Sequence, residues 1–143
     1  MNIRQDVLDL SAVFPAMMKY SDVCAALGIT DKYLYKLLKN KKIVYINLIR
    51  DKRIPSAFFV AYMLHDDVVY DKSFITKVYS YYLSYYPKKM TINQVCYALN
   101  ISKSTVKRML ADGELRYYNY HDTAKVLIYK DSLMSYMIEH TVR

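Results

Sequence analysis

Apolar residues recur at helical spacing along much of the chain, and this pattern predicts two helices that each precede a proline. The second of them covers residues 72–86 and can be capped by Asp71. The first covers residues 3–14. Pro15 and Pro87 follow, and we expect each proline to end its helix because the residue before a proline avoids helical geometry.

An internal repeat organises the chain. Residues 23–30 and 95–102 are identical at five of eight positions, at an offset of 72 residues. Further matches extend in both directions, and the offset becomes 74 near the end, so the second copy has two extra residues between Tyr117 and Ile128. Because each repeat is one supersecondary unit, we predict a first unit, residues 1–64 with its N-terminal helix, and a second unit, residues 65–143 with helix 72–86.

The sequence of each unit predicts two short helices joined by a tight turn. Gly28 and Asn100 occupy the turns, and these residue types best tolerate positive φ. Thr30 and Ser102 follow as N-caps of the next helix. The predicted helices cover residues 21–27 and 31–40 in the first unit, and residues 92–99 and 103–112 in the second. This order is that of a helix-turn-helix.

A β-rich stretch follows each helix pair. Aromatic and β-branched residues flank polar turns at residues 50–52 and 121–124, which predicts hairpins over residues 43–54 and 115–129. A charged hairpin directly after a helix-turn-helix is a wing. Closing helices are expected from Pro55, as a first-turn residue, to Met63 and from Asp131 to Ile138. The expected fold class is mainly α with small β-hairpin wings, a tandem winged helix-turn-helix whose two units share one core.

These motifs resemble the excisionase-type helix-turn-helix domains, relatives of the DNA-binding domain of MerR-like regulators. The second unit carries Leu99-Asn100-Ile101-Ser102, Thr105-Val106, Arg108 and Gly113-Glu114-Leu115. The first unit carries Leu27-Gly28-Ile29-Thr30, Lys36, Arg53-Ile54-Pro55 and Phe59-x-x-Tyr62-Met63. It departs from the family pattern where Lys41-Lys42 replaces Gly-x, and the second unit departs where Asn100 replaces the turn glycine. The resemblance implies an accessory factor that bends DNA for an integrase of a phage, plasmid or integrative element.

Charge is concentrated where such a fold would meet DNA. The net charge is +8, and residues 28–55 carry eight basic and two acidic side chains. A basic segment of this kind favours a polyanionic partner, although a solvated basic surface is the alternative interpretation. The helical pattern leaves a set of mostly polar and basic side chains to face outward from the second helix of each pair and from the wings. The candidate DNA-binding residues are Lys32, Tyr33, Tyr35, Lys36, Lys39, Arg50, Lys52, Arg53, Lys103, Ser104, Thr105, Lys107, Arg108 and Lys125.

We therefore predict a double-stranded DNA-binding protein, with AT-rich DNA as its target and an integrase or another DNA-processing protein as a possible partner. A transcriptional regulator of a phage or plasmid, an RNA binder and a protein–protein adaptor that has lost DNA binding remain alternatives. Helix 72–86 could pair two chains in a homodimer or pack within the monomer. The sequence shows no pattern of a catalytic triad, a paired-carboxylate site or a phosphate-binding loop. We therefore expect that the protein is not an enzyme and uses no cofactor.

Cys24 and Cys96 lie at equivalent repeat positions and are expected to be small core residues, so no metal site is predicted. No apolar run approaches the roughly 20 residues that span a bilayer, so no membrane partner is expected. We expect a cytoplasmic, nucleoid-associated protein.

Overall fold

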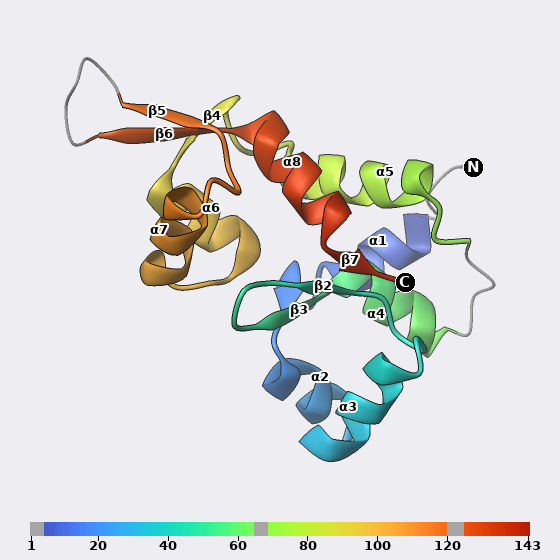
Figure 1. Ribbon diagram of the computed structural model, residues 1–143. Helices are drawn as coiled ribbons and strands as arrows, with labels where there is room; N and C mark the ends of the chain where they lie inside the picture. Colours follow the sequence, from blue (N-terminus) through green and yellow to red (C-terminus); the bar gives the residue numbers. More distant parts are fainter. Residues whose placement is uncertain (1–4, 65–68, 120–124) are drawn as a thin grey trace.

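The computed structural model describes residues 5–64, 69–119 and 125–143, and the same order of elements occurs twice in it (Figure 1). The first series is α1 Gln5–Ser11, β1 Met17–Met18, α2 Tyr20–Leu27, α3 Asp31–Lys39, β2 Tyr45–Asn47, β3 Lys52–Pro55 and α4 Ser56–Met63. The second is α5 Lys72–Leu83, β4 Lys89–Thr91, α6 Ile92–Leu99, α7 Lys103–Ala111, β5 Tyr117–Asn119, β6 Val126–Tyr129 and α8 Lys130–Glu139, followed by β7 Thr141–Val142. Helices thus predominate, with small antiparallel sheets, as expected of a mainly α fold.

Backbone geometry repeats with the sequence. Gly28 and Asn100 have φ of 65° and 55°, which confirms the left-handed turns predicted between the paired helices. Lys41 and Gly113, just after α3 and α7, have φ of 57° and 75°. Both pairs are separated by the repeat offset of 72 residues, so the same two sharp turns shape each unit. Lys41 thus occupies a left-handed position that glycine occupies in the second unit. Residues with a Cβ adopt this backbone conformation at a cost in free energy.

Replacing Lys41 with glycine is therefore expected to raise the free energy of unfolding by about 0.5–1 kcal/mol, since the relief of strain outweighs the greater freedom of glycine in the unfolded chain. Chemical denaturation monitored by circular dichroism measures the change. Lys41→Ala is the matched control, because it removes the same charge and leaves a Cβ at the strained position. Equal stabilisation by both variants would assign the effect to charge rather than to backbone strain.

The helices before the two prolines are shorter than the sequence pattern predicted. α1 ends at Ser11 and α5 at Leu83, rather than at residues 14 and 86. Beyond these ends the backbone tightens into turns, because the amide of Phe14 donates to the carbonyl of Ser11 at 3.1 Å and that of Tyr86 to Leu83 at 3.0 Å. Pro55 is likewise the residue before α4 rather than its first-turn residue.

Both predicted hairpins are present, as antiparallel β2–β3 (the first hairpin) and β5–β6 (the second hairpin). The predicted turn at residues 121–124 lies outside the described residues. Strands that were not predicted join both hairpins: β1 and β7 flank the first hairpin in the order β1-β3-β2-β7, and β4 joins the second in the order β4-β6-β5. Strands of two or three residues are too short to show alternation. Notably, β7 pairs with β2, so the second unit contributes a strand to the sheet of the first.

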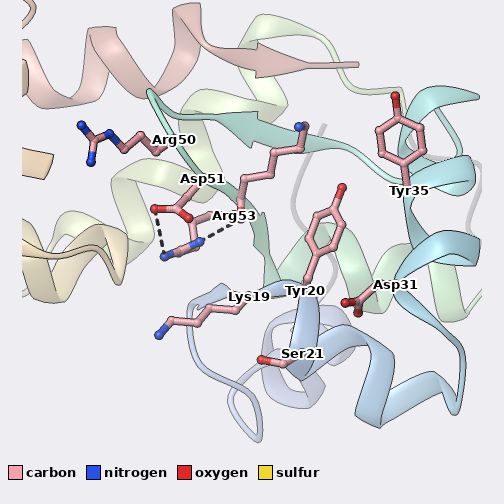
Figure 2. A pocket seen from close by; sticks show the side chains of 9 residues that line it. Lys19, Tyr20, Ser21, Asp31, Tyr35, Arg50, Asp51 and Arg53 are labelled. Carbon is pink, nitrogen blue, oxygen red and sulfur yellow. Dashed lines mark hydrogen bonds and ion pairs between the residues drawn. The ribbon is translucent and has the colours of Figure 1, made fainter.

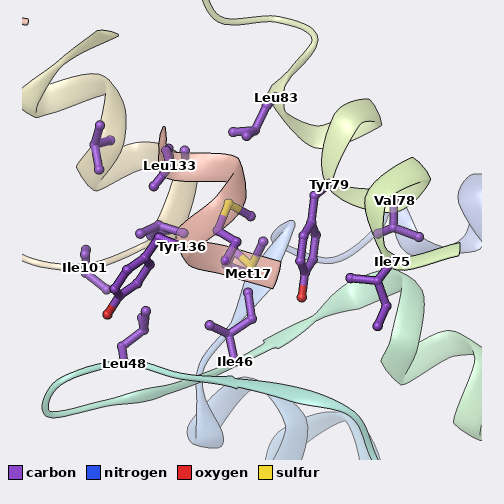
Figure 3. Close-up of a cluster of buried hydrophobic side chains, with 14 of the residues drawn as sticks. Met17, Ile46, Leu48, Ile75, Val78, Tyr79, Leu83, Ile101, Leu133 and Tyr136 are labelled. Carbon is purple, nitrogen blue, oxygen red and sulfur yellow. The ribbon is translucent and has the colours of Figure 1, made fainter. Parts of the chain in front are cut away.

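A large apolar cluster contains residues of both units. Figure 3 shows Met17 and Ile46 from the first unit facing Tyr79 and Leu133 from the second. A smaller cluster, which includes Leu34 and Phe59, lies within the first unit alone. α5 packs on α8 and places Tyr79, which is fully buried, in the shared cluster. The predicted shared core is therefore present, whereas the domain boundary at residue 64 stays a prediction.

Candidate nucleic-acid interface

The pair α2–α3 presents a basic and aromatic face of α3 to solvent. Thr30 caps α3, since its hydroxyl accepts the amide of Tyr33 at 3.2 Å. Leu34 and Leu38 are buried beneath the helix and fix its rotation. The five candidate residues of α3 are exposed, as the helical spacing predicted: Lys32, Tyr33, Tyr35, Lys36 and Lys39.

The pair α6–α7 follows the same plan with fewer charges. Val106 and Met109 are fully buried, and the side chains on the opposite face are exposed, namely Lys103, Ser104, Lys107 and Arg108. Thr105 was predicted to face outward and does not. It is 7% exposed, and its hydroxyl lies 2.9 Å from that of the capping Ser102. Thr105 follows the cap by one turn, so its side chain is drawn into the cap rather than toward a groove.

Arg53 is the second predicted DNA-binding residue whose side chain does not face solvent. Its side chain is buried, and its Nε donates to the backbone carbonyl of Asn100 at 2.8 Å. Nη1 donates to the carbonyl of Lys52 at 3.0 Å, and Nη2 lies 3.9 Å from the carboxylate of Asp51. Burial lowers the pKa of the guanidinium, while the nearby Asp51 raises it. Arg53 therefore joins the first hairpin to the α6–α7 turn and is not available to DNA.

Asn100 extends this junction between the units. Its left-handed backbone directs the carbonyl to Arg53, and its side-chain amide donates to the carbonyl of Met17 at 3.0 Å. Glycine, the usual residue of this turn in the family that the sequence resembles, would supply the backbone geometry but not this second bond. The departure at residue 100 thus has a structural reason: it fixes α6 against β1.

The other cations of the first hairpin border an open cleft of about 620 Å³ (Figure 2). Arg50 is exposed and Lys52 is half-buried, and both lie across the cleft from the start of α2 and the exposed Tyr35 of α3. Lys19, which precedes α2, also lines this cleft. Lys19 was not among the residues predicted to bind DNA, although its place beside the N-terminus of α2 was a usable signal.

The second hairpin carries cations of its own. Lys125 is exposed, at the start of the described part that follows residue 119. Lys89 on the adjoining strand β4 and Arg116 just before β5 were not predicted from the sequence, and they lie over the rings of Tyr118 and Tyr129 at 4.9 and 5.4 Å, respectively. Cation–π contacts hold such side chains in place without neutralising their charge. The two hairpins and α3 and α7 together thus present most of the candidate cations to solvent.

Comparison with known families bears on the second of these two helix pairs. Residues 90–141 match the model of a helix-turn-helix domain family. The matched segment runs from β4 to the first residue of β7 and includes one helix pair, α6–α7, so it corresponds to a single copy. No curated protein and no solved structure is significantly similar to the chain. A helix-turn-helix domain supports binding to double-stranded DNA.

No group of three or more metal-ligating side chains occurs in the part of the chain that the structure describes. Cys24 and Cys96 were expected in the core and instead lie half-buried at the edges of the apolar clusters, where burial raises the pKa of both thiols. Among the described helices, none is long and apolar enough to cross a membrane.

Proposed function

We propose that the protein binds double-stranded DNA through both units and serves a mobile element as an excisionase-like accessory or architectural factor. The observation that carries this proposal is the helix-turn-helix domain at residues 90–141. The exposed side chains of its α7, Lys103, Lys107 and Arg108, are of the types that bind phosphates and the edge of guanine.

The first unit supports a second DNA contact. Its α2, α3 and hairpin follow the same order as the matched domain, and its α3 exposes Lys32, Lys36 and Lys39. We interpret the chain as a tandem winged helix-turn-helix, in which α3 and α7 enter successive major grooves of a bipartite site, roughly 10 base pairs apart. One chain with two such helices binds a direct repeat and needs no palindrome.

The biological role rests on the resemblance to excisionase-type domains. Bending of DNA by two linked units would serve an integrase or another DNA-processing protein. Transcriptional regulation of a phage or plasmid uses the same recognition and is the alternative role. A homodimer through α5 is not part of the proposal, because the apolar face of this helix, including Tyr79 and Leu83, is already buried within the chain.

A protein–protein adaptor is the second candidate function. It is favoured by exposed tyrosines outside the hairpins, Tyr81, Tyr85 and Tyr97, of which the last two are 80% and 83% exposed. Large amphipathic rings of this kind are enriched at protein interfaces. The adaptor predicts no affinity for DNA, so a single binding experiment separates the two functions.

Titration of the full chain with AT-rich duplex DNA and with the same sequence as a single strand is the test. Tight duplex binding that weakens steeply between about 50 and 200 mM salt is expected, because phosphate neutralisation releases counterions. The variant Lys32→Ala/Lys36→Ala is expected to bind about ten- to a hundredfold more weakly, since it removes two cations from the exposed face of α3.

The matched control is Lys72→Ala/Lys88→Ala, which removes the same charge from exposed positions outside α3, α7 and the hairpins. Its duplex affinity should stay within about threefold of the unaltered protein. Equal losses in both variants would mean that only net charge matters and would contradict a specific role of α3. Absence of duplex binding even at low salt would favour the adaptor, and a preference for single strands would contradict major-groove binding.

A further inference from the structure

The first hairpin lies against α7, although the two belong to different units. Ile49 and Arg50, just before β3, share a small cleft of about 60 Å³ with Ser104, Thr105 and Arg108 of α7. Arg50 also borders the larger cleft next to α2 and α3. The hairpin tip therefore lies between the two helix pairs, and it contacts the second unit's DNA-facing helix rather than projecting into solvent alone.

This juxtaposition is fixed by the junction beneath it. Arg53, on the strand that follows the hairpin turn, donates to the carbonyl of Asn100, and Asn100 donates to the carbonyl of Met17. On the other side of the hairpin, β7 pairs with β2. The backbone segments that carry Arg50 and Arg108 are thus held relative to each other by the buried Arg53 and by the β2–β7 pairing, so the cleft exists before any ligand binds.

The cleft is cationic and lacks a carboxylate among the residues that line it. The nearest acidic neighbour in sequence to Arg50, Asp51, is directed to Arg53 at 3.9 Å. Arg108 has one exposed partner, Asp112, at 3.8 Å, and surface pairs of this kind contribute little. Two guanidinium groups on one cleft repel each other unless an anion lies between them. Phosphate oxygens match the fork of N–H donors on each guanidinium.

We propose that this cleft binds one phosphodiester group of the DNA backbone, which Arg50 of the first hairpin and Arg108 of α7 contact together. The proposal rests on the DNA-binding function given above and defines its geometry further. A phosphate held by both units requires that the DNA strand pass between the hairpin and α7. The two halves of the binding site must then adjoin at a fixed spacing, with the shared phosphate at their junction.

A double-mutant cycle with phosphate mapping tests the proposal. The probe is a duplex selected from a random library by the unaltered full-length protein, and a series of duplexes replaces one phosphate at a time with an uncharged methylphosphonate. Arg50→Ala and Arg108→Ala are each expected to weaken binding about tenfold, and the double variant hardly more than either single variant. One methylphosphonate position should weaken the unaltered protein similarly and have no further effect on the double variant.

Lys107→Ala is the matched control, because Lys107 is exposed on α7 and does not line the cleft. The losses of DNA affinity caused by Lys107→Ala and by Arg50→Ala should multiply when the two substitutions are combined. If the effects of Arg50→Ala and Arg108→Ala multiply to about a hundredfold, or if the two variants lose sensitivity to different methylphosphonates, the shared phosphate is wrong while DNA binding stands. A protein that binds no duplex at all would overturn both this proposal and the proposed function.

Discussion

Replacement of Tyr79 by alanine is expected to lower the free energy of unfolding by about 3–5 kcal/mol, the usual cost of truncating a buried aromatic side chain. Tyr79 is fully buried in the cluster that joins the two units and lies 6.0 Å from Phe58 of the first unit, between ring centroids. Its hydroxyl is 2.6 Å from that of Thr141, which in turn donates to the carbonyl of Met137. Burial raises the pKa of the Tyr79 hydroxyl above its ordinary value.

Denaturant unfolding of three variants separates the contributions. Tyr79→Phe removes only the hydroxyl and should cost about 1 kcal/mol, because the Thr141 hydroxyl keeps its bond to Met137. Tyr85→Ala, on a side chain that is 80% exposed, should change stability by less than about 0.5 kcal/mol. If Tyr79→Ala cost no more than Tyr85→Ala, the shared core would not stabilise the protein. Two separate unfolding transitions in Tyr79→Ala would indicate that this ring couples the units.

Replacement of Arg53 by alanine is expected to cost about 2–3 kcal/mol of stability, the second-largest effect among our predictions. The change leaves the carbonyl of Asn100 without its charged donor, and it removes the bond to Lys52. It also opens a gap between the first hairpin and the α6–α7 turn. The ion pair with Asp51 adds little, since its partners are 3.9 Å apart and Asp51 is exposed.

Arg50→Ala serves as the matched control, because Arg50 carries the same charge three residues earlier and is exposed. It should leave stability within about 0.5 kcal/mol of the unaltered protein and weaken DNA binding. If Arg53 has a structural role, denaturation should show the larger loss of stability for Arg53→Ala, and DNA titration should show the specific loss of affinity for Arg50→Ala. A stable Arg53→Ala protein with weakened DNA binding would instead restore Arg53 to the DNA-contacting residues predicted from sequence.

Local signals in the sequence predicted the helix-turn-helix elements well. Thr30 and Ser102 cap their helices, Gly28 and Asn100 adopt positive φ, and both hairpins form. Each of these features depends on a few neighbouring residues. The exposed face of α3 followed from the same local logic, because helical spacing alone decides which side chains lie opposite Leu34 and Leu38.

The errors arose where distant parts of the chain decide the outcome. Arg53 lies on β3 directly before the buried Ile54, and nothing near it in sequence reveals that the carbonyl of Asn100 would draw it inward. Strand β7 is likewise too short to be recognised without its partner strand. Thr105 is the exception, because its burial follows from its local contact with the capping Ser102. The exposed residues of α7 were therefore predictable apart from Thr105, but the contact of this helix with the first hairpin was not.

The pairing of β7 with β2 also bears on how the protein folds as it is synthesised. All the helices and strands of the first unit have left the ribosome long before Thr141 and Val142 are made, yet Tyr45 and Ile46 pair with these two residues. Until then the outer edge of β2 has no strand beside it, and unpaired edges invite association with other chains. Closure across most of the chain's length is also slow compared with local helix formation. The first hairpin of a nascent chain therefore keeps an open edge until β7 is made, and this strand then completes the sheet of the first unit.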